Sequence, residues 1–196
     1  MNLSTCTEKE LLVHVSSGDE RAFRLLFDLY QPKIYSFARY VTRSTFLAEE
    51  IVQEVFMKIW ISRHELSGVE YFIAYLKTIA RNVAANYLKR LAHERLILQH
   101  FSVGAPASRP VTDEDVIANE LQRAIEDAIA ALPPRQREIY LLHRQEYLKQ
   151  EEIAKRLDIS IHTVKEHIKK AIAAIRASVE QRIDVIIVIA LREFFQ

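Results

Sequence analysis

Apolar residues recur at intervals of three and four along almost the whole chain, and this spacing restricts the fold more than any other feature. Such intervals are typical of helices that bury one face, whereas strands alternate apolar and polar residues. The first stretch with this spacing runs from Phe23 to Val41, with a kink or break expected at Pro32. The second runs from Leu47 to Trp60, and the third from Phe72 to Tyr87, in a helix that is expected to begin at Ser67. Strict alternation is rare. The sequence therefore predicts an all-α fold.

Composition narrows the class of protein further. The chain has 196 residues, of which 49% are hydrophobic, enough to bury a core. Its three glycines form no phosphate-binding loop, and its one cysteine, Cys6, allows no internal disulfide, as is usual in a reducing cytosol. The longest apolar run, Val185 to Leu191, is far shorter than the ~20 residues of a membrane helix. The polar N-terminus lacks the apolar core of a signal peptide. We therefore expect a cytoplasmic protein without a membrane span.

Breaks in the helical spacing divide the chain. Gly104, Pro106 and Pro110 interrupt it among small polar residues. We predict two small helical domains, residues 1–98 and 115–180, a flexible linker at 99–114, and an apolar helical tail at 181–196. Residues 101–134 contain two basic and six acidic side chains, and residues 135–182 contain eleven basic and seven acidic ones. The basic excess of the second domain is compatible with a nucleic-acid partner.

A helix-turn-helix is predicted between Gln150 and Ala171. A short helix with Ile153, Ala154 and Leu157 inward leads to a tight turn, where Asp158 needs a left-handed backbone. A second helix follows, with Ile161 among its inward positions. Its polar positions suit the major groove of DNA, although a polar face can also be merely solvated. The predicted duplex-binding residues are Ser160, His162, Thr163, Lys165, Glu166, Lys169 and Lys170.

Two polar faces stand out in the first domain. An acidic, amide-bearing face turns away from Ile51, Val55 and Ile59 and suits a basic partner helix; its residues are Glu49, Glu50, Gln53, Glu54 and Lys58. The other face combines cations with amides and aromatic rings, which is the combination that unpaired DNA requires. Its residues are Tyr71, Tyr75, Lys77, Arg81, Asn82, Asn86, Lys89 and Arg90. The alternatives are a solvated surface for the polar side chains and a place in the core for the two tyrosines.

The order of the motifs resembles a known family. The segments AEEIVQEVFMKIW (from Ala48) and YFIAYLKTIARNVAANYLKR (from Tyr71) resemble region 2 of sigma-70 factors, and residues 132–171 resemble region 4. With only these two regions, the chain resembles an extracytoplasmic-function (ECF) sigma factor, and the iron-citrate-sensing subgroup is a candidate. Such a protein binds core RNA polymerase, directs it to promoters and promotes strand opening.

The resemblance implies a role for each surface. The Glu49–Lys58 face would bind the clamp helices of the polymerase β′ subunit, and region 4 would bind the β flap. The helix-turn-helix would read duplex DNA at the −35 element. The Tyr71–Arg90 face would hold the melted strand of the −10 element, with a loop from Lys89 to Arg95 near a flipped base. The acidic linker would enter the RNA channels. The tail would pack on its own domain or bind an anti-sigma factor or other recruiting protein.

Other functions fit parts of the pattern. A LuxR-like regulator with a helical sensor or dimerisation domain would share the helix-turn-helix, and a helical adaptor would bind protein only. Catalysis is not expected. His64-Glu65 and His93-Glu94 begin a zinc-protease motif, but Gly68 and Ile97 replace its second histidine. We therefore expect no catalytic residues, no metal and no cofactor.

Overall fold

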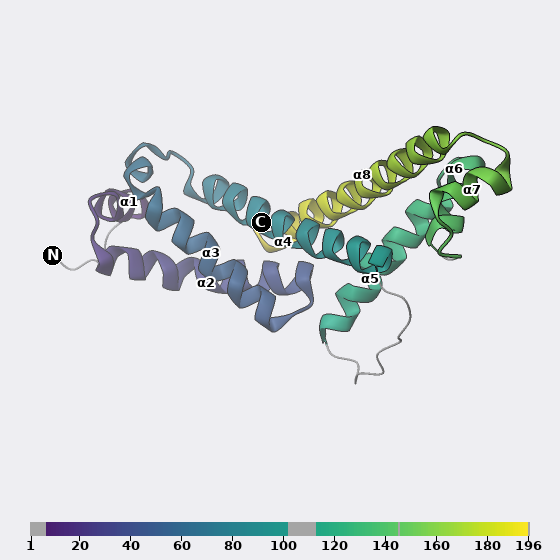
Figure 1. Ribbon diagram of the computed structural model, residues 1–196. Helices are drawn as coiled ribbons and strands as arrows, with labels where there is room; N and C mark the ends of the chain where they lie inside the picture. Colours follow the sequence, from purple (N-terminus) through teal and green to yellow (C-terminus); the bar gives the residue numbers. More distant parts are fainter. Residues whose placement is uncertain (1–6, 102–112, 145, 196) are drawn as a thin grey trace. The chain divides into compact units, whose positions relative to one another are not determined.

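Helices make up all the regular structure in the part of the chain that the computed structural model describes, residues 7–101, 113–144 and 146–195 (Figure 1). The all-α prediction is confirmed. The elements are α1 (Glu8–Ser16), α2 (Glu20–Thr42), α3 (Thr45–Ile61), a 3-10 helix η2 (Arg63–Gly68), α4 (Phe72–Phe101), α5 (Asp113–Ala130), α6 (Pro134–Arg144), α7 (Gln150–Leu157) and α8 (Ile161–Phe194). No helix within these ranges combines the length and the apolar content needed to cross a bilayer.

Side chains before the first three helices satisfy backbone groups that would otherwise be unpaired. The Thr7 hydroxyl accepts a hydrogen bond from the Glu10 nitrogen, and the Glu10 carboxylate accepts one from the Thr7 nitrogen at 2.8 Å. Asp19 accepts from the nitrogens of the first turn of α2, and Ser44 accepts from the Leu47 nitrogen. These caps explain why each helix begins where it does.

Three expectations about helix boundaries were wrong. Pro32 was predicted to kink or break its helix, and the break was wrong: α2 continues through Pro32, because Tyr30 and Ile34 on either side are buried in one apolar stripe. The third helix was predicted to begin at Ser67, which instead lies in η2; the buried Leu66 draws this turn inward. The loop predicted from Lys89 is helical, since α4 extends to Phe101.

The described residues form two compact units. The first contains α1 to α3, η2, α4 as far as Leu88, and α8 from Val185 onward. Helices α2 and α3 lie side by side (Figure 1), and their buried side chains include Leu26, Phe37 and Ile51. The Tyr30 hydroxyl donates a hydrogen bond to the Glu8 carboxylate, which ties α1 to α2, and burial raises the pKa of Tyr30.

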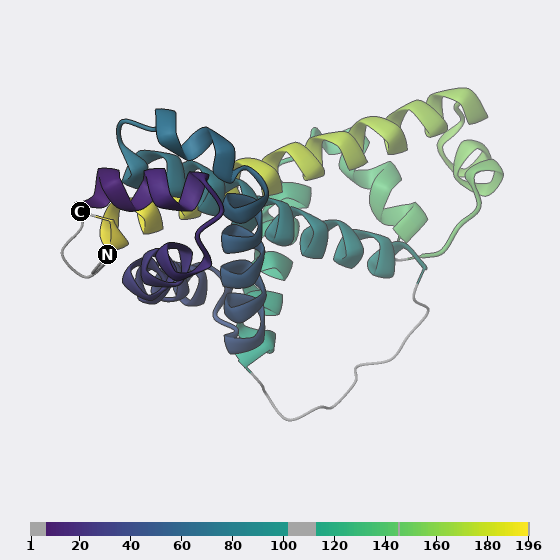
Figure 2. The ribbon, with the colours of Figure 1, turned by 90° about the vertical axis from the view of Figure 1, so that its left-hand side faces the viewer.

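The last part of the tail belongs to this first unit. Ile187 and Ala190 are fully buried and Phe195 is 3% exposed. The Phe195 ring packs on Phe37 of α2, so the yellow end of α8 lies against α2 (Figure 2). The sequence left the tail's place open between its own domain and a partner protein. The structure instead packs residues 185–195 with the helices that contain the predicted single-strand face.

The second unit contains residues 89–184. Its core cluster joins α6, α7 and the first half of α8 and consists of Ile139, Leu142, Ile153, Ala154, Val164 and Ile168. The predicted domain limits at 98, 114 and 180 are sequence boundaries and stay predictions. Linker residues 102–112 lie outside the described residues, as do the side chains of Asp113, Glu114 and Asp115.

Candidate nucleic-acid interface

The turn between α7 and α8 adopts the predicted conformation. Asp158 has φ 51° and ψ 50°, so its left-handed backbone is confirmed. This conformation directs the Ile159 nitrogen to the Ala154 carbonyl at 3.0 Å and ends α7. The Ser160 hydroxyl then accepts a hydrogen bond from the Thr163 nitrogen at 3.0 Å and starts α8. The turn therefore fixes both helices of the motif through local contacts.

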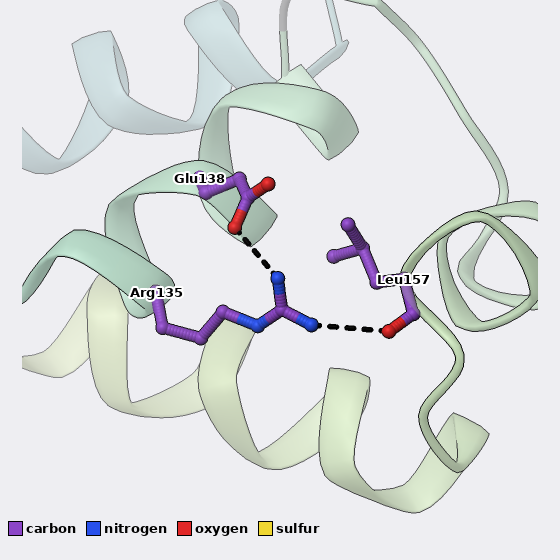
Figure 3. Close-up of polar contacts among 3 residues, drawn as sticks. All are labelled: Arg135, Glu138 and Leu157. Carbon is purple, nitrogen blue, oxygen red and sulfur yellow. Dashed lines mark hydrogen bonds and ion pairs between the residues drawn. The ribbon is translucent and has the colours of Figure 1, made fainter.

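The turn is also held by a residue outside the predicted motif. Arg135 of α6 donates one hydrogen bond to the Leu157 carbonyl at 3.1 Å and another to the Glu138 carboxylate at 2.8 Å (Figure 3). The Leu157 carbonyl lies at the end of α7, where carbonyls lack partners within the helix. Sequence reasoning missed Arg135, because its separation of 22 positions from Leu157 leaves no local signal.

The predicted duplex-binding residues share the surface of α8 opposite its buried side chains. Val164, Ile168 and Ala171 are buried. The exposed members of the predicted set are Ser160, His162, Lys165, Lys169 and Lys170, and the partly exposed ones are Thr163 and Glu166. Ile161 was expected to point inward but is 41% exposed, because it occupies the first position of α8, before the buried stripe begins.

Within the first unit, the predicted single-strand face contains some exposed side chains and others that contact neighbouring residues. Tyr71 is 72% exposed, which excludes a core role, and Arg81, Asn82 and Asn86 are exposed as well. Tyr75 is partly buried, and its hydroxyl lies 2.8 Å from that of Ser62. Lys77 is partly buried too, with its ammonium 5.7 Å from the centroid of the Phe195 ring.

The remaining two residues of this set lie in the second unit, and both have acidic partners. The Lys89 ammonium is 3.3 Å from the carboxylate of Asp184, and Arg90 is 3.8 Å from Glu94. Both pairs are substantially exposed to solvent, so each contributes at most about 1 kcal/mol. DNA phosphates can therefore replace these carboxylates at small cost.

The predicted acidic face on α3 lies at the surface. Glu49, Gln53 and Lys58 are exposed, Glu50 and Glu54 are partly exposed, and Glu54 pairs with Lys58 at 3.4 Å. Three apolar residues of the same helix are at least half exposed, and sequence reasoning did not select them: Phe46 at 60%, Met57 at 57% and Ile61 at 67%. No signal of this exposure was present in the sequence, because Glu50 and Gln53 separate Phe46 from Met57 on the same face of α3.

An open apolar groove of about 500 Å³ adjoins this face. Its lining comes from α2 and α3 and comprises Glu20, Phe23, Phe27, Gln53, Phe56, Met57 and Trp60. The Phe23 and Trp60 rings are 4.8 Å apart, which makes the floor aromatic. Because Gln53 belongs to both the face and the groove, one partner could contact the two together. Across the residues that the structure describes, no group of three metal-binding side chains is found.

Comparison with known proteins identifies the family. Residues 26–94 match the family model "Sigma-70 region 2", and residues 122–175 match "Sigma-70, region 4". An ECF RNA polymerase sigma-E factor of Haemophilus influenzae is 32% identical over 84% of this chain and 91% of its own length.

Two further similarities are more limited. A probable RNA polymerase sigma factor RfaY of Xanthomonas campestris pv. campestris is 28% identical over 88% of this chain, which spans only 44% of that protein. The solved structure of CnrH in complex with the cytosolic domain of CnrY covers 87% of this chain and 95% of that one, at 22% identity and a TM-score of 0.35. The second similarity supports no conclusion about this chain.

The two matched regions and their order define a member of the sigma-70 family. More specifically, the chain is an RNA polymerase sigma factor of the ECF type. It therefore binds core RNA polymerase and promoter DNA in transcription initiation. Its first domain is a sigma region 2 and not the sensor domain of a LuxR-like regulator. The iron-citrate-sensing subgroup stays a prediction.

Proposed function

We propose that this sigma factor divides its work among three exposed helix faces. The face of α3 binds the β′ clamp helices of polymerase, the face of α4 holds the melted −10 strand, and the start of α8 reads −35 duplex DNA. The observation that carries the proposal is the exposure of all three faces opposite buried apolar stripes. On this account the protein works in the cytoplasm, supplies no catalytic group, and leaves the chemistry to polymerase.

The side chains at the start of α8 are of the kinds that bind duplex DNA. Lys169 and Lys170 supply two adjacent cations for phosphates, while His162 and Glu166 present groups that can bind base edges. The exposed side chain of Ile161 adds an apolar group for a thymine methyl. Arg135 contributes to duplex binding indirectly, because its hydrogen bond to the Leu157 carbonyl fixes the end of α7 next to the turn.

The side chains on the face of α4 are of the kinds that bind single-stranded DNA. The exposed Tyr71 ring can stack on an unpaired base, Arg81 can pair with the backbone, and Asn82 can hydrogen-bond to a base edge. Stacking on an aromatic side chain contributes ~1–3 kcal/mol per base, which helps to offset the cost of unpairing.

The face of α3 has the composition of a protein interface. Phe46 near the start of α3 and Met57 and Ile61 near its end supply exposed apolar side chains, and the carboxylates of Glu49 and Glu50 between them suit a basic partner helix. We assign this face to the β′ clamp helices and leave the β flap to region 4.

Exposed apolar side chains also favour a protein regulator. Val185, Val188 and Ile189 of α8 are each more than half exposed, and the groove beside Trp60 is open. Apolar surface of this kind commonly marks a contact with another protein. An anti-sigma factor or a recruiting protein would cover it and thereby control access to polymerase.

A charge-reversal pair tests the polymerase assignment. The full chain is labelled at Cys6, its single cysteine, and titrated with bacterial core polymerase. Glu49→Lys with Glu50→Lys is expected to weaken binding about tenfold or more, because interface repulsion replaces attraction. Asp28→Lys with Glu65→Lys makes the same change in charge at exposed sites elsewhere. Equal affinity of the two double variants would contradict the assignment.

A further inference from the structure

Two aromatic side chains near the end of α8 contact residues that suit DNA binding. Phe195 is almost fully buried, with its ring 6.1 Å from that of Phe37. The Lys77 ammonium lies 5.7 Å from the centroid of the same Phe195 ring. Phe195 is therefore held between an aromatic residue of α2 and a cation of α4.

Phe194 has a similar environment. Its ring is 5.5 Å from that of Tyr40, and the Arg43 guanidinium lies 4.7 Å from the centroid of the Tyr40 ring. Phe194 and Phe195 thus lie next to each other in sequence, each on an aromatic residue of α2, with Arg43 and Lys77 as the nearby cations. We call the four receiving residues, Phe37, Tyr40, Arg43 and Lys77, the ring seat.

The ring seat has the chemistry of a site for unpaired nucleic acid. Flat aromatic surfaces accept stacked bases in any sequence, and adjacent cations neutralise the backbone. In the docked state the Phe195 ring meets the Phe37 ring edge-on and the Phe194 ring is tilted against the Tyr40 ring, so the two phenylalanines cover aromatic surfaces on which bases could stack. Lys77 also belongs to the predicted single-strand face, so one cation serves both the tail and the proposed DNA site.

We propose that the tail from residue 185 onward is an internal competitor for the melted −10 strand. While docked, it covers the ring seat and engages Lys77; displacement of Phe194 and Phe195 makes both available to the strand. This inference rests on the proposed function of α4.

The tail's partial burial is compatible with displacement. Ile187 and Ala190 face inward, but Val185, Val188 and Ile189 are each more than half exposed. The docked contact therefore involves one face of the helix. If the tail only stabilised the fold, apolar contacts would suffice. Instead, the Phe195 ring lies against the ammonium of Lys77, a cation that the melted strand would also bind.

Binding of single-stranded DNA tests the proposal. The probe is a fluorescein-labelled pool of random-sequence DNA, titrated with the full chain at low salt. Phe194→Ala with Phe195→Ala is expected to tighten binding about fivefold, because the competing rings are gone. Lys77→Gln alone is expected to weaken DNA binding. Added to the double phenylalanine variant, Lys77→Gln should remove most of the gain in affinity. Val188→Ala with Ile189→Ala, at exposed positions of the same helix, should leave the affinity unchanged.

Chemical modification reports on the contact itself. Acetylation of lysines, read by mass spectrometry, should modify Lys77 more slowly than the exposed Lys58 in the parent chain. Phe195→Leu preserves apolar volume but removes the ring, so it keeps the fold if the double variant does not. Phe195→Leu should raise the acetylation rate of Lys77 about threefold and should also tighten DNA binding, as the double alanine variant does.

The outcomes separate this inference from the proposed function. If Lys77→Gln weakens DNA binding but Phe195→Leu does not tighten it, the tail is not a competitor, and the proposed DNA site on α4 is retained. Faster Lys77 acetylation without tighter DNA binding also overturns the competitor. If no variant binds the pool, alone or on core polymerase, both ideas fail.

Discussion

The hydroxyl of Ser160 lies 2.8 Å from the hydroxyl of Thr163 and also accepts a hydrogen bond from the Thr163 nitrogen. Both residues were predicted to contact DNA, yet in the structure they first contact each other. Their main role in the free protein is therefore to start α8 and to fix its direction. We expect His162, Lys169 and Lys170 to make more of the direct contacts with DNA.

Loss of this cap should destabilise the second unit. Ser160→Ala removes the acceptor for the Thr163 nitrogen and is expected to lower the free energy of unfolding by about 1 kcal/mol. Urea denaturation followed by circular dichroism measures the change. Ser160→Asp preserves an acceptor and should keep most of the stability. Equal losses in the two variants would contradict the capping role.

The turn residue Asp158 gives a second stability prediction. Its left-handed backbone favours glycine, so Asp158→Gly should be neutral or slightly stabilising, while Asp158→Ala should cost about 1 kcal/mol. Thermal unfolding of the two variants side by side provides the comparison. A more stable alanine variant would show that the backbone conformation is not what selects this residue.

Salt dependence tests the duplex-binding face. Lys169→Ala with Lys170→Ala should weaken binding to duplex promoter DNA and reduce the salt slope by roughly one unit per lost phosphate contact. Fluorescence anisotropy at several salt concentrations measures both quantities. Lys9→Ala with Lys33→Ala removes two exposed lysines of the first unit and serves as the control. An unchanged slope in the α8 variant would exclude these lysines from the interface.

Strand opening tests the face of α4. Asn82→Ala removes an exposed amide and should leave polymerase binding intact while reducing open-complex formation several-fold. Permanganate reactivity of unpaired thymines measures opening, and gel filtration measures the polymerase complex. Thr78→Ala alters a neighbouring exposed side chain, whose hydroxyl bonds to the Ala74 carbonyl, and should have little effect. If Asn82→Ala abolished polymerase binding, the assigned role would be wrong.

Local chemistry explains which features could be predicted. The left-handed Asp158, the Ser160 cap and the polar surface of α8 depend on neighbours within a few residues, and periodic spacing predicted the helices around them. The predicted break at Pro32 was wrong because burial on both sides outweighs the local preference of proline to end a helix.

Long-range contacts could not be predicted from spacing. Arg135 reaches Leu157 across 22 residues, and Phe195 packs on Phe37 of α2 from the far end of the sequence. Helical periodicity shows that residues 181–196 need a partner surface but does not identify it. The exposed Met57 and Ile61 were missed for a related reason, since an apolar residue on a helix reads as core until a structure shows it uncovered.

Transcription in a purified system tests the central claim most directly. The full chain and bacterial core polymerase are mixed with a library of genomic fragments, and the 5′ ends of the transcripts are sequenced. The account predicts transcripts that start at a defined set of fragments sharing −35 and −10 elements, and only when both components are present. If the chain neither bound core polymerase nor changed where transcripts begin, the assignment of its surfaces to polymerase and promoter would be contradicted.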